Sequence, residues 1–510
     1  MSASLSAARK ALAKHAFVLY PRSVRVRRTA LFSVSPWLLL FAVASVATVA
    51  AGCAPRDAGF STVKKEVHDR VGHVPRYRDV EGDEDADTTR HIQSWLASPL
   101  DADHAVQIAL LRNPRLQAAF ARLGVARAGL LGASLLPNPE LEAELGVPQN
   151  GGPLHWTFAV TESLSGLIAL PLRRAQASAD LARAQVQAAS DALDVAYQAR
   201  RAFYLCQAAE QELLVVRDTV AVAALTSELL TRLREAGNVT ELDVTEARAF
   251  EQNARLVEAA AEQVALETRA TLWQWLGGPR NPADLQVAEH LPEIPKELPA
   301  LASLERRAIA RSLDLRRLDA ERDYLESTAS AAQIQGVLPE LRAGVVIERE
   351  QGEWEIGPAA AVSLPIFNQG QARIAATAAA ERGVFYERQA RVLTIRSLAH
   401  TLRGRLERAA DRVNRYSEEL LPMRHSIVDQ TLRQYNAMQT GVRELLFART
   451  QELDANRAYV AALRTYWLLR ADLDQLLAGR LMDDGRVAVD ATSPATAMPT
   501  MTGTTGQGDH

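Results

Sequence analysis

The sequence predicts a mainly α-helical protein with short membrane β-strands and an internal duplication. Its 510 residues are 48% hydrophobic but only 5% aromatic, a composition that favours long helices packed through small side chains. Two segments alternate polar and apolar residues with the period of a β-strand, and the long stretches that follow them contain few glycines or prolines. Both kinds of segment recur after about 200 residues, which indicates a structural repeat.

The N-terminus has the pattern of an export signal. Basic residues precede an apolar run over 37–51, so residues 1–52 are expected to be a signal peptide. The run ends in Ala50-Ala51-Gly52-Cys53, which resembles a bacterial lipobox and predicts acylation of Cys53. Because Ala50 stands where such motifs usually have leucine, an ordinary signal peptide with an incidental Cys53 is the alternative. Residues 53–98 are expected to form an acylated, extended segment.

The first repeat is predicted over residues 99–278. A helix begins near residue 101 and reaches about Leu135, where Pro137-Asn138-Pro139 ends it. Alternating residues on both sides of a Pro- and Gly-rich turn predict a β-hairpin over 139–164. A long helical hairpin over 172–277 follows, turning at Gly237-Asn238.

The second repeat is predicted over residues 300–480, after a proline-punctuated linker over 279–299. It contains a helix at 304–334, a β-hairpin at 339–365 and a helical hairpin at 368–479 that turns at Gly441. Pro422 has no counterpart in the first repeat and predicts a kink in the second long helix. Residues 481–510 are expected to be a disordered tail.

The β-hairpins predict the oligomeric state. Strands of roughly 10 residues are long enough to cross a membrane, and strands in lipid must close into a barrel because no backbone group can stay unpaired there. Four strands cannot enclose a useful interior, for which about eight are needed. Three copies would supply twelve strands, an even number within the bacterial range. We therefore expect a homotrimer in which a 12-stranded β-barrel continues into an α-barrel of helical hairpins.

Several motifs resemble those of the TolC-type outer-membrane factors. They are Ala-Leu-Leu-Arg-Asn-Pro-Arg-Leu at 109–116, Leu-Leu-Pro-Asn-Pro-Glu-Leu at 135–141, Ser-Leu-Pro-Ile-Phe-Asn-Gln-Gly at 363–370 and Gly-Val-Arg-Glu-Leu-Leu-Phe-Ala-Arg at 441–449. The resemblance covers residues 98–480. It implies an outer-membrane location with a helical tube in the periplasm, and a periplasmic adaptor and an inner-membrane transporter as partners.

Two groups of residues are functional candidates. If the apolar strand faces contact lipid, the acidic faces line the barrel lumen; any polar residue would also suit a water-filled lumen. These acidic candidates are Glu140, Glu142, Glu144, Glu348 and Glu355. The helix turns should form the periplasmic tip, which by resemblance docks the adaptor and narrows the pore. The tip candidates are Gly237, Asn238, Thr240, Asp243, Gly441, Arg443 and Glu444. For the acids among them, helix capping is the alternative role.

The remaining patterns argue against catalysis. The ten histidines lack metal-ligand spacing, and no phosphate-binding or hydrolase motif occurs, so neither a cofactor nor a metal is expected. Cys206 lies among apolar residues of a predicted helix and is expected to be a buried thiol. A net charge of −3 gives no basic footprint for nucleic acid.

The predicted function is therefore a passive exit duct for small toxic solutes, either metal ions or drugs. The alternatives are an exported coiled-coil scaffold or adaptor without a barrel, and the exit duct of a protein secretion system.

Overall fold

The computed structural model describes residues 59–77, 86–147, 151, 154–278, 281–282, 285–296, 303–337, 340–350 and 353–482. The predicted signal peptide, Cys53 and the tail from residue 483 onward lie outside these residues. The described residues divide into two compact units: those at 59, 122–185 and 318–387 form one, and those at 60–121, 186–317 and 388–482 form the other.

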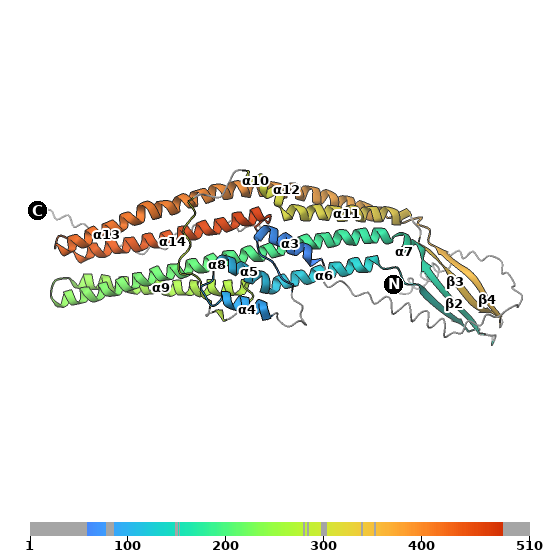
Figure 1. Ribbon diagram of the computed structural model, residues 1–510, viewed down its shortest axis with the longest axis horizontal. Helices are drawn as coiled ribbons and strands as arrows, with labels where there is room; N and C mark the ends of the chain where they lie inside the picture. The colour runs from blue at the N-terminus through green and yellow to red at the C-terminus, as the bar shows by residue number, and fades with distance from the viewer. Residues whose placement is uncertain are drawn as a thin grey trace, which may run out of the picture. The chain divides into compact units, whose positions relative to one another are not determined.

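Unit 1 contains a four-stranded antiparallel sheet (Figure 1). Its strands are β1 (Glu140–Gly146), β2 (His155–Ser163), β3 (Leu341–Glu350) and β4 (Glu353–Val362), in that spatial order. Both predicted hairpins are thus present, and β2 and β3 join them into one sheet. Leu164, predicted to belong to the strand, instead begins the short helix α7 (Leu164–Ile168), because Ser163 Oγ accepts a bond from Gly166 N at 3.1 Å and caps it.

Four helices contribute residues to both units: α6 (Pro114–Ser134), α8 (Leu170–Glu235), α11 (Leu313–Val337) and α12 (Gln371–Asn414). In unit 1, α8 packs on α11 through polar contacts. Arg183 lies 2.8 Å from Glu321 and its guanidinium stacks on the Tyr324 ring. Gln176 donates to Thr328 at 3.0 Å.

Unit 2 is built on the two helical hairpins. The first pairs α8 with α9 (Glu241–Trp275), and the second pairs α12 and α13 (Leu421–Asn436) with α14 (Val442–Ala478); Figure 1 shows the helices of each hairpin running side by side. The core between them includes fully buried Ile108, Leu276, Leu406, Tyr466 and Leu473.

The prediction of an extended segment over 53–98 was wrong where the structure describes it. The segment contains α3 (Phe60–Val71) and α4 (Ala86–Trp95). Val63 and Val67 lie one helical turn apart and are buried in unit 2. A single pair of valines is a weak periodic signal, which is why the helix was missed.

The predicted linker over 279–299 packs against unit 2 rather than running free. Leu285 and Leu291 are buried, and Val287 forms a parallel β-bridge with Leu100. Gln207 of α8 donates to the carbonyl of His290 at 2.7 Å. Residues 285–296 therefore form a packed part of unit 2.

Both helices predicted to open the repeats are broken in two. α5 (Ala102–Arg112) ends at Asn113, and α10 (Leu304–Arg311) ends at Ser312. Each break residue has extended ψ and caps the helix that follows: Asn113 Oδ1 accepts from Arg115 N at 2.9 Å, and Ser312 Oγ accepts from Leu315 N at 3.2 Å. Pro114 explains the first break, since it disfavours helical backbone in the preceding residue. The second has no proline to announce it.

At the end of each repeat, a glycine packs against the helix break near the start of the same repeat. Gly277 follows α9 and Gly479 follows α14, both with positive φ. A Cβ on Gly277 would lie 2.7 Å from the Arg112 carbonyl oxygen, and one on Gly479 would overlap that of Arg311. Only glycine permits this backbone and this approach together. The duplication predicted from sequence therefore extends to the packing of the helix ends.

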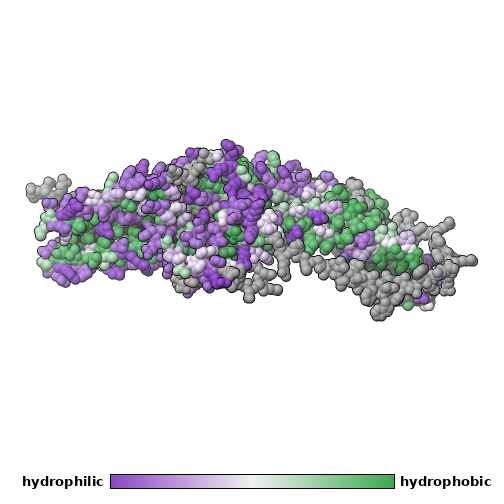
Figure 2. All heavy atoms as spheres, viewed as in Figure 1, coloured by the Kyte–Doolittle hydropathy of each residue, from purple (hydrophilic) through white to green (hydrophobic). Residues whose placement is uncertain are grey.

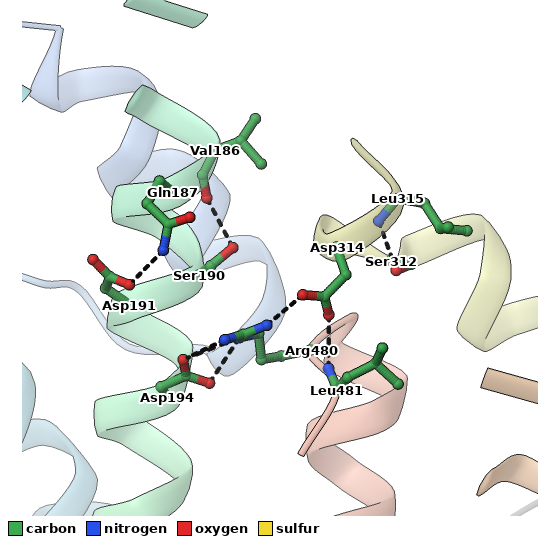
Figure 3. A network of polar contacts seen from close by, with 10 residues as sticks. All are labelled: Val186, Gln187, Ser190, Asp191, Asp194, Ser312, Asp314, Leu315, Arg480 and Leu481. Carbon is green, nitrogen blue, oxygen red and sulfur yellow. Dashed lines mark hydrogen bonds and ion pairs between the residues drawn. The ribbon is translucent and has the colours of Figure 1, made fainter. Parts of the chain in front are cut away.

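A polar clamp fixes the end of the second repeat (Figure 3). Arg480 donates to both carboxylate oxygens of Asp194 on α8 at 2.9–3.0 Å and also bonds Asp314 of α11. Leu481 N donates to the other Asp314 oxygen at 2.8 Å. Burial raises the pKa of Asp194 to about 6, although the bonds from Arg480 oppose that shift.

The second long helix is disturbed where Pro422 predicted a kink. A π-helical stretch, η2 (Arg415–Leu420), separates α12 from α13, and Pro422 follows in the first turn of α13. Proline cannot donate to the carbonyl one turn earlier, and π-helical turns commonly absorb such interruptions.

Candidate channel face and helix turns

The sheet register places all five acidic strand candidates on one face. Opposite Glu140, Glu142 and Glu144 on β1 lie Thr161, Ala159 and Thr157 on β2. Thr157 in turn pairs with Glu348, and Glu348 with Glu355. Three of the predicted glutamates, Glu144, Glu348 and Glu355, therefore share one row across the four strands, with Thr157 between them.

A cation that was not among the candidates lies on the same face. Arg342 of β3 contacts Glu140 at 2.7 Å and Glu340 at 3.1 Å. These contacts compensate the charge near the strand ends that adjoin the helices, and the glutamate row lies farther along the strands. The alternation over 341–349 places Arg342 on the same face as Glu348, and this pattern could have identified Arg342 from the sequence.

The opposite face is apolar and exposed. Leu141, Val160, Val345 and Ile356 lie in register across the strands or beside one another, with exposed fractions between 48% and 74%. Exposed apolar surface of this extent marks an interaction surface or a membrane contact. The structure thus separates an apolar sheet face from an acidic one.

Trp156 of β2 and Trp354 of β4 lie in a single row of the sheet. Trp156 pairs with Arg349, and Arg349 pairs with Trp354. The Arg349 guanidinium lies 5.5 Å from the centre of the Trp354 ring. The row lies at the end of the sheet where each hairpin turns, a position that suits an aromatic belt.

The first helix turn lies at Gly237-Asn238, as predicted. Gly237 adopts φ 77°, and Asn238 N bonds back to Leu233 O at 2.9 Å, ending α8. Thr240 and Asp243 form a reciprocal capping box at the start of α9. The Thr240 side chain, followed by its backbone N–H, lowers the pKa of Asp243. The capping alternative for Asp243 is therefore realised in the structure.

The second turn is built differently from the prediction. The residue with positive φ is Met438 at 56°, not Gly441, which is the N-cap of α14 with extended backbone. Gly441 contributes no side-chain cap, and Glu444 takes the position of Asp243 in the first turn of its helix. Alignment of the repeats would have found this, because Met438 follows Ala437 as Gly237 follows Ala236.

The two turns enclose a cavity of about 220 Å³ between the hairpins. Apolar side chains from α8, α9 and α14 line it, including Leu230, Phe250 and Phe447. Hydrophobic side chains fill the band between the hairpins near their turns in Figure 2. At its rim Arg443 forms an ion pair with Glu246, so the predicted tip residue Arg443 links the two repeats.

Among the described residues, no group of three or more His, Cys, Asp or Glu side chains is arranged to hold a metal ion. No helix in the same part of the chain has both the length and the hydropathy needed to span a bilayer. Cys206 is buried, and burial raises the pKa of its thiol to about 12.

Comparison with known proteins identifies similar chains. No family model matches the sequence. The chain is 25% identical over 293 residues to the cobalt-zinc-cadmium resistance protein CzcC of Cupriavidus metallidurans, a match that covers 54% of this chain and 66%, slightly less than two thirds, of that protein.

Solved structures of outer-membrane channels match over most of the chain. The channel OprN gives a TM-score of 0.62 at 18% identity and covers 79% of this chain and 98% of its own. VceC of Vibrio cholerae gives 0.61 at 15% identity and covers 75% and 97%. The resemblance predicted from the motifs is confirmed: the chain has the mainly helical, four-stranded fold of the TolC-like outer-membrane channels.

Proposed function

We propose that three copies of this chain form a passive exit duct across the outer membrane, the channel component of a tripartite efflux system. The observation that carries the proposal is the two-faced sheet attached to paired helical hairpins. Its apolar face suits lipid, and its acidic face suits a water-filled lumen. No step in this role requires catalysis.

The sheet edges support the trimer. β1 and β4 each have a single neighbour within the described sheet, so each offers an edge of unpaired backbone groups. Such edges cannot remain open in lipid. Joining β4 of one copy to β1 of the next closes twelve strands from three copies and removes every edge.

The acidic face supports cationic cargo. Threefold repetition of Glu144, Glu348 and Glu355 would place a ring of carboxylates in the lumen, which favours cations. CzcC carries cobalt, zinc and cadmium resistance in its name, so divalent metal ions are the cargo we favour over drugs or secreted proteins.

The finer assignments follow from the resemblance. Acylation of Cys53 would anchor the chain to the membrane that the barrel crosses. The turns at Gly237 and Met438 would form the periplasmic tip, where the adaptor docks and the ion pair between Arg443 and Glu246 narrows the pore. An inner-membrane pump would drive transport.

Fractionation tests the location and assembly. The duct predicts a heat-modifiable trimer that needs detergent for extraction from outer membranes. Release by salt alone would refute it and would favour the coiled-coil scaffold.

Planar-bilayer recording tests the lumen. Glu144→Gln, Glu348→Gln and Glu355→Gln combined should lower the preference for cations over anions, whereas Glu267→Gln on the exposed surface of α9 should not. Equal selectivity in both variants would exclude the acidic row from the lumen.

Sensitivity of a deletion strain to cobalt, zinc and cadmium, against a panel of drugs, then identifies the cargo.

A further inference from the structure

An open cleft of about 650 Å³ lies in unit 1 where the strands meet the helices. The end of β2, the residue before β3 and the segment that follows β4 all border it. Its walls differ in chemistry. Arg173 of α8, Ser165 and Glu340 contribute polar groups, and Leu364, Ile366 and Phe367 contribute apolar ones.

Arg173 lacks an anionic partner within the part of the chain that the structure describes. Its Nη2 donates to the Gly166 carbonyl at 3.3 Å, and its Nε is buried without a hydrogen-bond partner. Among the described residues no carboxylate forms an ion pair with it, in contrast to neighbouring Arg183, which has Asp180 and Glu321. A half-buried guanidinium with donors to spare is suited to bind a carboxylate or phosphate.

Glu340 places the opposite charge in the same cleft. Its carboxylate contacts Arg342 at 3.1 Å and is 58% exposed, so it keeps acceptor capacity for a second cation. A simple anion on Arg173 would meet this negative charge at the cleft wall. A zwitterion with a phosphate and a primary ammonium would satisfy both walls.

The apolar wall is unusual for water-exposed surface. Leu364, Ile366 and Phe367 are 69%, 66% and 91% exposed, and they follow within a few residues of the apolar sheet face that ends at Val362. Phe367 in particular buries almost none of its ring within the chain. Hydrocarbon that continues from the sheet face would cover these side chains.

The location fits a membrane surface. β3 and β4 each have ten residues, which matches the span of the hydrocarbon core for a tilted strand. The strand ends, and hence the cleft, would then lie at the level of the lipid headgroups on the side that carries the helices. This step rests on the proposed function.

We propose that the cleft binds a zwitterionic glycerophospholipid of that leaflet. Arg173 holds the phosphate, Glu340 accepts from the ammonium, and Leu364, Ile366 and Phe367 contact the acyl chains. Free phosphate would use only the first of these three features.

Native mass spectrometry of the purified full-length trimer tests the site. The chain offers a matched control, because Arg174 is adjacent, exposed and outside the cleft. Wild type and Arg174→Gln should retain added phosphatidylethanolamine, whereas Arg173→Gln should bind it about tenfold more weakly, as expected for loss of a charge-assisted bond. Equal retention by both variants would overturn the proposal.

Two further arms identify the ligand chemistry. Glu340→Gln should weaken phosphatidylethanolamine but not phosphatidylglycerol, which has no ammonium. Loss of both lipids, or of neither, would overturn the role of Glu340. If inorganic phosphate competes with the lipid and its binding is unchanged by Phe367→Ala, the cleft is a phosphate site instead. A wild-type trimer that inserts and conducts but binds no lipid refutes the site alone; failure to form a trimer refutes the proposed function.

Discussion

Replacement of Gly277 by alanine should weaken unit 2 more than the same change at Gly237. Both glycines follow a long helix and have φ 77°, so alanine pays the same left-handed backbone cost of about 1–2 kcal/mol at each. They differ in surroundings. Apart from its own chain neighbours, no heavy atom lies within 4 Å of a Cβ on Gly237, whereas a Cβ on Gly277 would lie 2.7 Å from the Arg112 oxygen.

The extra cost at Gly277 follows from that contact. A carbon and an oxygen normally approach to about 3.3 Å, so the Arg112 carbonyl must move by roughly 0.6 Å. Asn113 moves with it, and its side chain donates to Trp275 O at 2.8 Å from a buried position. Loss of such a bond costs about 1–3 kcal/mol. Gly277→Ala should therefore cost about 2–5 kcal/mol in free energy of unfolding, against about 1–2 kcal/mol for Gly237→Ala, so the extra cost is about 1–3 kcal/mol.

Circular dichroism at one heating rate, on trimers in detergent, measures the difference. For a unit of this size 1 kcal/mol corresponds to about 1–2 °C in apparent Tm, so Gly277→Ala should melt about 1–6 °C below Gly237→Ala. Hydrogen exchange should show faster opening around Asn113 in the first variant only. Equal melting of the two variants would refute the close-approach argument.

Arg480→Met leaves Asp194 and Asp314 without their shared cation and should lower the free energy of unfolding by about 3 kcal/mol. An unchanged apparent Tm would show that these ion pairs do not stabilise the protein. Asp243→Asn removes the negative charge at the third position of the capping box and should cost about 0.3–1 kcal/mol at neutral pH. Because Thr240 lowers the pKa of Asp243, that contribution is fully present above the unfolded pKa of about 4 and is lost as the pH falls through the lower folded pKa. The stabilities of the two proteins should therefore converge as the solution is acidified. Met438→Gly removes a left-handed backbone cost of about 1 kcal/mol and should raise the apparent Tm. Met423→Gly, which is also exposed but lies inside α13, should lower the apparent Tm. A lower apparent Tm for both variants would contradict a backbone cost at Met438.

The strands were predictable because their signal is local. Each hairpin alternates along its own residues and is interrupted by turn formers, and the register then follows from keeping one face apolar. The helix breaks depended on context. Pro114 announces the first, but Ser312 becomes a break only because Gly479 packs on the preceding carbonyl and accepts from Leu313 N at 2.7 Å.

The charged partners could not be predicted for the same reason. Arg480 lies far in sequence from Asp194 and Asp314, and no local pattern distinguishes it from the other arginines of the chain. Arg342 was placed on the correct face by alternation, yet its contact with Glu140 depends on the joining of β2 to β3, which sequence does not specify. Alternation fixes which face a residue occupies, and only the fold fixes its neighbour.

The two helix turns show how duplication leads to unequal parts. The first has glycine where the backbone is left-handed and a threonine that caps the returning helix. The second has Met438 and Gly441 at the equivalent positions, so it bears a backbone cost and lacks a side-chain cap. Each difference is worth about 1 kcal/mol, and both act in the same direction. The second hairpin also contains the π-helical stretch before Pro422. The second helix turn is therefore less stable than the first, although both descend from one duplicated unit.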